Sequence, residues 1–381
     1  MNSFLKITVT GLIFFFSCSF LIAQPSNHIL PDKSTTDIVK IALDHTYNFE
    51  FEESKTYCEQ IRKRYPMHPG PDFIMALNLY WEMFYNDSFK EKSPQMLAYL
   101  THSIELSKKM LTYDEKDVEG VFFKLANECY LALYYSERDE TSSSIGYARK
   151  MYSSLKVAMT LKDKLNEFYF PTGVYNYYVV MYPEVHPVFK PFMFMFMDGD
   201  KALGLKEMDY AWKNAVFCKM ECGYHLCNIY LKYEGKPLLA YPYTKALYEK
   251  YPGNIFFALR HAEALIAKGD YKEAEKIAHI LYKSDKKYFV SASFVLYGLL
   301  YENYFKEPET ASMFFQKAIQ KFQETANPEK DYLSMAYAGM GRYYKQAGNK
   351  QKATEYYKKC RDIAEYVIVA KEADLYLSNK K

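Results

Sequence analysis

The sequence lacks any strong excess of charge and any recognised motif for catalysis. Its 49 Lys and Arg residues nearly balance 46 Asp and Glu residues, which gives a formal net charge of +3 without a basic cluster. Such a balance argues against a nucleic-acid-binding surface. The HExxH motif, the Gly-rich phosphate loop and the nucleophile elbow are absent, and no acidic pair can be assigned as acid and base. We therefore expect a non-enzymatic protein that uses no cofactor.

Long apolar runs are equally scarce, and the only marked one lies at the N-terminus. Lys6 supplies a short positive region, and the uncharged run from Ile7 to Ile22 is about 16 residues long, below the roughly 20 that a spanning helix needs. This pattern predicts a cleaved export signal over residues 1–23. Lipidation at Cys18 is the alternative, although the residues before it lack the leucine and small pair of lipoprotein signals. We expect an exported protein, either periplasmic or associated with the outer membrane.

Cysteine is sparse, and its pattern does not match a familiar metal site. Cys218, Cys222, His225 and Cys227 fall within ten residues, and thiolates with an imidazole are the ligands of tetrahedral zinc. The gaps between them differ from the paired CxxC spacing of zinc knuckles. A disulfide between Cys218 and Cys222 is a second possibility. We favour a third interpretation, in which these cysteines are buried free thiols and no metal is bound.

Aromatic residues are abundant, with 39 Tyr and 27 Phe, and some recur with a clear period. The pattern aromatic-x2-apolar-Gly-x2-Tyr followed by Ala-x3-aromatic is formed by Tyr337, Met340, Gly341, Tyr344, Ala353 and Tyr357. This pattern resembles the tetratricopeptide repeat family. The resemblance implies that Gly341 and Ala353 lie where two antiparallel helices cross, and that Gly348 ends the first helix.

The same register continues upstream. Gly235 and Gly269 are 34 residues apart, as are Ala240 and Ala274, and another unit begins near Ser291. The resemblance is firm over residues 221–365 and looser before them. It implies an all-α, right-handed superhelix of helix-turn-helix units, an α-solenoid. Together with the predicted export signal, it suggests an exported bacterial protein of this type. We predict a flexible lead-in at 24–34, N-terminal repeats at 35–166, an insertion at 167–198, a C-terminal repeat array at 199–366, and a capping helix and tail at 367–381.

The predicted insertion is rich in proline, methionine and aromatic residues. Four prolines between residues 168 and 197 argue against one long helix, so we expect a short helix near 174–181 followed by an extended apolar stretch. We favour a wedge buried between the two repeat blocks. The alternative is an exposed docking loop that contacts a partner or a membrane face, formed by Phe192, Met193, Phe194, Met195, Phe196 and Met197.

The family resemblance also implies a ligand groove. In such repeats the second, fifth, ninth and twelfth residues of each first helix tend to line the concave surface. From the positions that result we select as candidates His225, Ile229, Lys232, Phe256, Leu259, Glu263, Leu299, Glu302, Arg342 and Lys345. The alternative is that the insertion or a neighbouring superhelical turn covers some of them.

These observations favour an exported scaffold that binds a protein or peptide partner in a concave groove. Two other functions remain open. One is an envelope carbohydrate-binding protein, because tyrosine and tryptophan rings can stack on sugars, and surplus exposed tyrosines on one face would support it. The other is a structural component of an outer-membrane assembly that is attached through residues 192–197.

Overall fold

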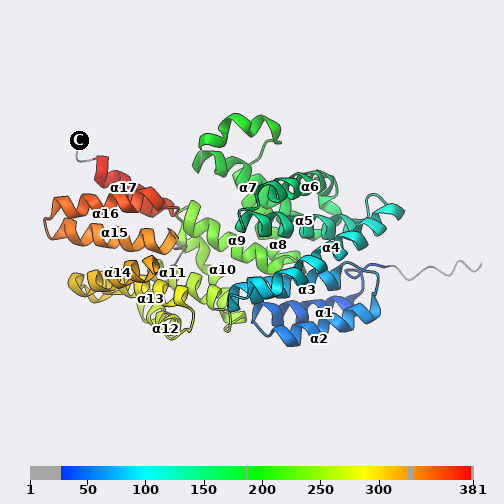
Figure 1. Ribbon diagram of the computed structural model, residues 1–381, viewed down its shortest axis with the longest axis horizontal. Coiled ribbons are helices and arrows are strands. Elements are labelled where there is room, and N and C mark those ends of the chain that lie inside the picture. The colour runs from blue at the N-terminus through cyan, green and yellow to red at the C-terminus, as the bar shows by residue number, and fades with distance from the viewer. Residues whose placement is uncertain (1–26, 186, 325–329, 379–381) are drawn as a thin grey trace, which may run out of the picture.

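The computed structural model describes residues 27–185, 187–324 and 330–378 of the chain, and all regular secondary structure in these ranges is helical (Figure 1). The all-α prediction is therefore confirmed. The α-helices are α1 (Lys33–Tyr47), α2 (Phe51–Arg64), α3 (Gly70–Asn86), α4 (Phe89–Tyr113), α5 (Val118–Glu137), α6 (Thr141–Thr160), α7 (Tyr169–Val185), α8 (Lys201–Asn214), α9 (Lys219–Asn228), α10 (Pro237–Lys250), α11 (Ile255–Lys268), α12 (Tyr271–Tyr282), α13 (Lys287–Leu300), α14 (Pro308–Gln323), α15 (Lys330–Gln346), α16 (Lys350–Ile363) and α17 (Val367–Ser378).

Shorter helical segments join or extend these helices. Two 3-10 turns precede α7, a 3-10 segment follows it, and π-helical turns extend α9 and α13. They are η1 (Lys162–Lys164), η2 (Asn166–Phe168), η3 (Pro187–Met195), η4 (Ile229–Tyr233) and η5 (Tyr301–Phe305).

Helices that follow one another in the chain pack side by side, which makes the molecule a solenoid. Each odd-numbered helix from α1 to α15 pairs with the next helix, and neighbouring pairs stack on one another. In Figure 1 the stack runs from the blue N-terminal pair on the right to the red C-terminal helices on the left. Because one repeat cannot bury its own apolar face, this stacking provides the continuous core. The helix α17 packs against α15 and α16 at the end of the stack.

Small residues allow the paired helices to approach closely. A Cβ atom built on Gly341 of α15 would lie 2.9 Å from the ring of Tyr357 on α16. Gly348, with a φ of +73°, follows the end of α15. The crossing role of Gly341 and the terminating role of Gly348 are thereby confirmed. A similar close approach at glycine occurs between α7 and α8, where a Cβ atom built on Gly204 would lie 2.6 Å from the carbonyl oxygen of Gly173.

The region predicted as an insertion requires correction. Instead of a short helix at 174–181, α7 extends from Tyr169 to Val185 and pairs with α8. Pro171 is tolerated because it lies in the first helical turn, where its missing N–H group has no intrahelical partner. Pro183 removes one intrahelical hydrogen bond, and the helix ends two residues after it. Only residues 187–199 leave the stack, and they form the green ribbon above α7 in Figure 1.

The N-terminal helices and the C-terminal repeats share one hydrophobic core. Phe73 of α3, Phe217 before α9 and Phe257 of α11 belong to the same buried cluster. Polar contacts join the same regions: Asn254 Nδ2 donates to the carbonyl oxygen of Tyr47 at 2.8 Å, and the Tyr251 hydroxyl donates to Asp44 Oδ1 at 2.6 Å. The helices α1 and α3 therefore pack directly against the region of α10 and α11.

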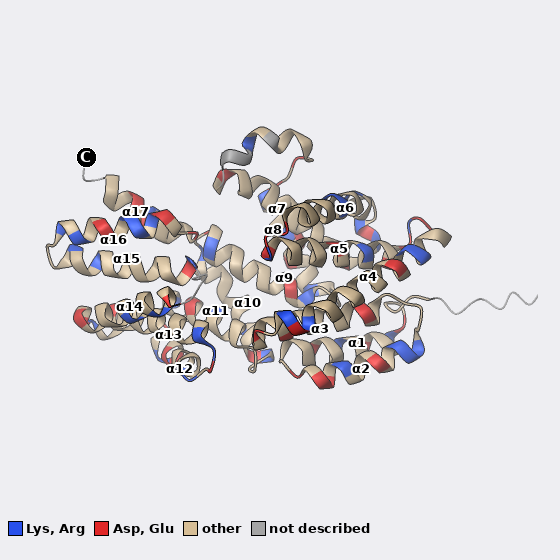
Figure 2. Cartoon of the chain, viewed as in Figure 1, with Lys and Arg blue, Asp and Glu red and all other residues tan. Residues whose placement is uncertain are grey.

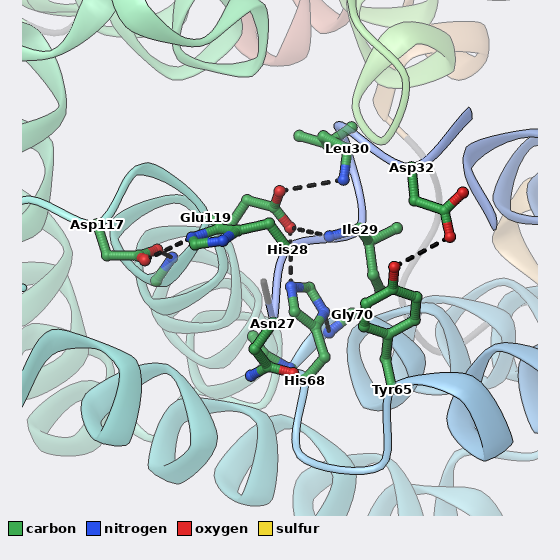
Figure 3. Close-up of polar contacts among 12 residues, drawn as sticks. Asn27, His28, Ile29, Leu30, Asp32, Tyr65, His68, Gly70, Asp117 and Glu119 are labelled. Atoms are coloured by element: carbon green, nitrogen blue, oxygen red, sulfur yellow. Dashed lines mark hydrogen bonds and ion pairs between the residues drawn. The ribbon is translucent and has the colours of Figure 1, made fainter. Parts of the chain in front are cut away.

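The segment before α1 is held in place rather than flexible. Glu119 of α5 accepts hydrogen bonds from the backbone N–H groups of Ile29 and Leu30, both at 3.0 Å, and contacts His68 Nε2 at 2.8 Å (Figure 3). Ile29, His68 and Glu119 are buried. The predicted flexible lead-in is thus wrong from residue 27 onward, because a buried carboxylate on a distant helix satisfies its backbone donors. Residues 24–26 lie outside the described part of the chain.

Side chains of both signs are interspersed on the described helices. In Figure 2, Lys and Arg residues alternate with Asp and Glu residues along the stack. Across the described residues, no helix combines the length and the hydropathy that spanning a bilayer requires. The predicted export signal at residues 1–23 lies outside the described residues.

Candidate functional site

The predicted groove is closed over α9 because α7 packs against it. The His225 ring contacts Phe170 and Tyr178 of α7, with ring centroids 5.3 and 6.5 Å apart. Ile229 is fully buried in a cluster that includes Tyr177 and Met181 of α7. Burial lowers the pKa of His225 to about 4, so its imidazole is neutral at physiological pH. These two positions face protein rather than an open groove.

The groove positions on α11 are also occupied by neighbouring side chains. Leu259 is 2% exposed, and Phe256 packs against Phe289 with ring centroids 4.9 Å apart. Glu263 is buried and accepts hydrogen bonds from the hydroxyls of Tyr332 and Tyr366. Such fully partnered groups hold helices together and leave little capacity for a ligand.

Arg260 and Lys232 complete the polar contacts in this region. Arg260 Nη1 donates to Glu263 Oε1 at 2.7 Å. Lys232, in the π-helical turn after α9, forms an ion pair with Asp331 Oδ2 at 2.6 Å. The predicted groove positions from His225 to Glu263 therefore agree with the alternative that neighbouring elements cover part of the groove.

The C-terminal end of the predicted groove is more open. Leu299, Glu302 and Arg342 are half-buried, and Lys345 is exposed. The Arg342 guanidinium forms a two-point contact with Glu302 at 2.6 and 2.7 Å and reaches Glu372 Oε2 of α17 at 2.9 Å. A cavity of about 240 Å³ lies beside this arrangement. A ligand role for these four residues stays a prediction.

The segment 187–199, called the projecting segment below, exposes apolar side chains at its tip. Phe194 is 85% exposed, Met195 57% and Phe196 41%, while Met193 and Met197 are half-buried. The side chain of Phe192 lies outside the described part of the structure. The favoured prediction of a wedge buried between the repeat blocks is therefore wrong at the tip, because the pairing of α7 with α8 leaves the tip outside the stack.

The base of the projecting segment is fixed to the stack. The Tyr175 hydroxyl donates to the carbonyl oxygen of Met197 at 2.6 Å, and the N–H group of Met197 donates to the Tyr152 hydroxyl at 3.0 Å. A Cβ atom on Gly199 would lie 2.8 Å from the carbonyl oxygen of Asn176. The exposed tip is thus carried on a base that contacts both α6 and α7.

The cysteine cluster takes packing positions. Cys58, Cys129, Cys218, Cys222, Cys227 and Cys360 are free thiols, and among the described residues no group of three His, Cys, Asp or Glu side chains is arranged to hold a metal ion. The Cys218 thiol donates to Glu167 Oε2 at 3.0 Å, and this carboxylate also accepts the N–H groups of Val216 and Cys218. Burial raises the pKa of the Cys218 thiol well above its ordinary value.

One surface feature escaped the sequence reasoning. Tyr241, Tyr248, Tyr271 and Tyr304 line a cleft between α10, α11, α12 and η5, and none of them is among the predicted site residues. Two signals could have found it. Tyr241 and Tyr248 are seven residues apart on one helix and so share a face, and Tyr271 and Tyr304 are separated by 33 residues, close to one repeat.

The helix pairs α13–α14 and α15–α16 have the same internal geometry, with a glycine of the first helix against an aromatic ring of the second. Residues 290–365, which span these pairs, match the family model described as "Tetratricopeptide repeat". This part of the chain contains tetratricopeptide repeats. This confirms the resemblance deduced from Tyr337, Gly341 and the residues around them. No curated protein matches the chain at a significant level.

Three solved structures show a distant similarity to this chain. The human IFIT1 dimer with PPP-AAAA shares 16% identity over 82% of this chain and 68% of its own, with a TM-score of 0.38. The P58(IPK) TPR domain shares 10% identity over 91% and 99%, and Naa15/Naa10 bound to HypK-THB shares 12% over 91% and 66%, both with a TM-score of 0.25. Scores this low support no inference about ligands or partners.

Proposed function

We propose that this tetratricopeptide repeat protein is an exported, non-enzymatic scaffold that binds a protein partner through the tip of the projecting segment. The observation that carries the proposal is the 85% exposure of Phe194, next to Met195 and Phe196 at 57% and 41%. Large apolar side chains that stay in water at adjacent positions mark interaction surfaces. Methionine and phenylalanine together adapt to the shape of a partner.

The packing of the repeats supports this location over the inner groove. Tetratricopeptide repeats generally mediate protein–protein interaction, but here α7 covers His225 and Ile229, and a polar network occupies Glu263. The anchored base of the projecting segment reduces the ordering cost of binding, since Tyr152 and Tyr175 already hold Met197. The C-terminal groove end near Arg342 is a further surface that an elongated partner can reach.

Export is part of the proposal and rests on the N-terminal sequence. The apolar run from Ile7 to Ile22, with Lys6 before it, is typical of a cleaved signal. We expect a mature chain that begins at Gln24 and resides in the periplasm or at the outer membrane. Intact-mass measurement of the protein purified from fractionated cells tests this, because retention of residues 1–23, or acylation at Cys18, would contradict it.

The partner surface is tested by crosslinking and affinity capture from native envelope. The bait is the mature protein, compared with a variant carrying Phe194→Ser and Met195→Ser. Both side chains are exposed, so the substitutions remove apolar contact area without disturbing the core. We expect one dominant protein to be recovered with the wild type and lost with the double variant.

A matched control and a membrane test complete the design. Met313 of α14 is 61% exposed and lies far from the projecting segment in the sequence, so Met313→Ser should leave capture unchanged. Capture that survives the Phe194→Ser, Met195→Ser double substitution would overturn the location of the surface. The wild type and the double variant are also cosedimented with vesicles of envelope lipid. If only the wild type binds the vesicles and no protein is captured, the tip binds a membrane face rather than a protein partner.

A further inference from the structure

A second surface, separate from the projecting segment, has the properties of a small-ligand site. It is the tyrosine-lined cleft between α10, α11, α12 and η5, with a volume of about 630 Å³. That volume falls within the range of about 300–1,000 Å³ typical of small-molecule sites. It is also larger than the cavity of about 240 Å³ beside Glu302.

Two aromatic groups form the walls of the cleft. On one side the rings of Tyr241 and Tyr248 lie 5.7 and 5.2 Å from the buried ring of His261. On the other side Tyr271 and Tyr304 stack at 5.2 Å with an interplanar angle of 25°. The helices α10, α11 and α12 and the turn η5 thus fix the aromatic surfaces before any ligand arrives, which reduces the ordering cost of binding.

The hydroxyl groups of the tyrosines are available to a ligand. Within the part of the chain that the structure describes, the hydroxyls of Tyr241, Tyr248, Tyr271 and Tyr304 make no hydrogen bond. A tyrosine combines an apolar ring with a group that can donate and accept. The cleft therefore offers apolar faces and hydrogen-bonding groups at the same place.

The charges at the cleft largely neutralise one another. Glu249, Asp270 and Glu273 at the cleft each pair with a lysine: Lys245 at 3.6 Å, Lys268, and Lys276 at 2.7 Å. Lys272 also lines the cleft and forms no ion pair with the residues that the structure describes. Burial lowers the pKa of His261 to about 4, so this ring carries no charge at neutral pH. The Lys268 ammonium already lies 4.8 Å from the centroid of the Tyr241 ring, where it takes the place that a cationic ligand would occupy. A strongly anionic ligand would meet the carboxylates of Glu249, Asp270 and Glu273 at the cleft. The site instead fits an uncharged ligand.

We propose that this cleft binds a neutral saccharide. A pyranose ring presents apolar C–H faces to aromatic rings and hydroxyl groups to hydrogen-bonding partners, which matches the walls and free hydroxyls of the cleft. The paired Lys245 and Glu249 add donors and acceptors at the rim without imposing a net charge. The glycine at position 269, with a φ of +88°, ends α11 beside Tyr271 and leaves the entrance free of a side chain.

The proposal is tested with the mature full chain by calorimetric titration with maltotriose, cellotriose and chitotriose as uncharged probes, and with tetramethylammonium as the cationic comparison. We expect at least one trisaccharide to bind. Tyr304→Ala, which removes a 39% exposed ring, should weaken that binding by about tenfold, equivalent to about 1.4 kcal/mol. Tyr248→Phe, which keeps the ring and removes the hydroxyl, should weaken it by a smaller factor.

Tyr113→Ala is the matched control, because this tyrosine is 92% exposed on α4, outside the cleft. It should leave the affinity unchanged, and melting curves identify any variant that fails to fold. Binding of none of the trisaccharides, equal binding by the Tyr304→Ala, Tyr248→Phe and wild-type proteins, or binding of tetramethylammonium alone would each overturn the proposal. None of these results depends on capture of a protein partner by Phe194 and Met195.

Discussion

At the scale of single residues, the ring of Phe315 on α14 lies between glycines of two different helices. Cβ atoms built on Gly298 of α13 and Gly339 of α15 would lie 2.5 and 2.4 Å from this ring. Gly339→Ala should therefore destabilise the fold by about 1–2 kcal/mol. Overpacking costs about 1–3 kcal/mol, and the higher helix propensity of alanine offsets up to about 1 kcal/mol of that cost. Urea unfolding measures the change.

Gly146 provides the opposite case. It lies within α6, and a Cβ atom built on it would meet nothing within 4 Å. Gly146→Ala should leave stability unchanged or raise it by up to about 1 kcal/mol through helix propensity alone. If both alanine variants shifted the unfolding midpoint in the same direction, the close packing around Phe315 would not be the cause.

A second residue-scale prediction concerns Glu221 of α9. Burial raises the pKa of Glu221 from its ordinary 4.5 to about 7, although the hydrogen bond from the Tyr47 hydroxyl opposes this rise. The folded state therefore holds a proton that the unfolded chain releases above pH 4.5. The free energy of unfolding should fall by about 1–3 kcal/mol as the pH rises from 4.5 through 7.

Glu221→Gln isolates this contribution, because the amide cannot ionise. Urea unfolding at pH 5 and pH 8 should show a smaller pH dependence in Glu221→Gln than in the wild type, and the variant should gain stability relative to the wild type at pH 8. An identical pH dependence in the two proteins would show that Glu221 titrates near its ordinary value in the folded state.

At the scale of elements, the packing of the residues before α1 depends on a side chain far along the sequence. Glu119→Ala would leave the buried N–H group of Ile29 and the partly buried N–H group of Leu30 without an acceptor, and it would remove the partner of His68. We expect a loss of about 2–4 kcal/mol and faster hydrogen exchange at these two amides. Mass-spectrometric hydrogen exchange on N-terminal peptides measures the second effect.

His28 supplies the control for this element. Its ring contacts Asp117 at 2.6 Å, but the side chain is 33% exposed. His28→Ala should therefore cost no more than about 1 kcal/mol and leave the Ile29 and Leu30 amides protected. Equal exchange in the two variants would mean that the buried carboxylate does not anchor the segment.

At the scale of the whole molecule, the shared core predicts that the N-terminal helices and the central repeats unfold together. A repeat array can lose its ends independently, because each unit contacts only its neighbours. Here Phe73 of α3 and Phe257 of α11 lie in one cluster, and Asn254 joins α11 to Tyr47. Native-state hydrogen exchange should give the same opening free energy for the slowest amides of α3 and α11.

Asn254→Ala tests this coupling. The substitution removes the cap of α11 and the contact with the Tyr47 carbonyl, and it should lower the opening free energy of both helices by about 1–3 kcal/mol. A loss confined to α11 would indicate that the N-terminal helices unfold separately from the repeats, despite their contact in the folded state.

The sequence by itself determined the repeat architecture. A spacing of 34 residues, small residues such as Gly341 at helix crossings, and Gly348 after the first helix are local signals. They depend on neighbours within one repeat, so periodicity alone makes them readable. The same signals placed the candidate groove positions on the first helices of the repeats, since each position follows from the register.

The tertiary structure decided which of those positions are accessible. The pairing of α7 with α8 put Phe194 in water and placed α7 over Ile229. Glu119 fixed Ile29 across a separation of 90 residues, and four helical segments together formed the tyrosine cleft. Each of these outcomes depends on contacts between residues that are distant in the chain. Local periodicity carries no information about such contacts, because it fixes which face a residue takes on its helix but not which element covers that face.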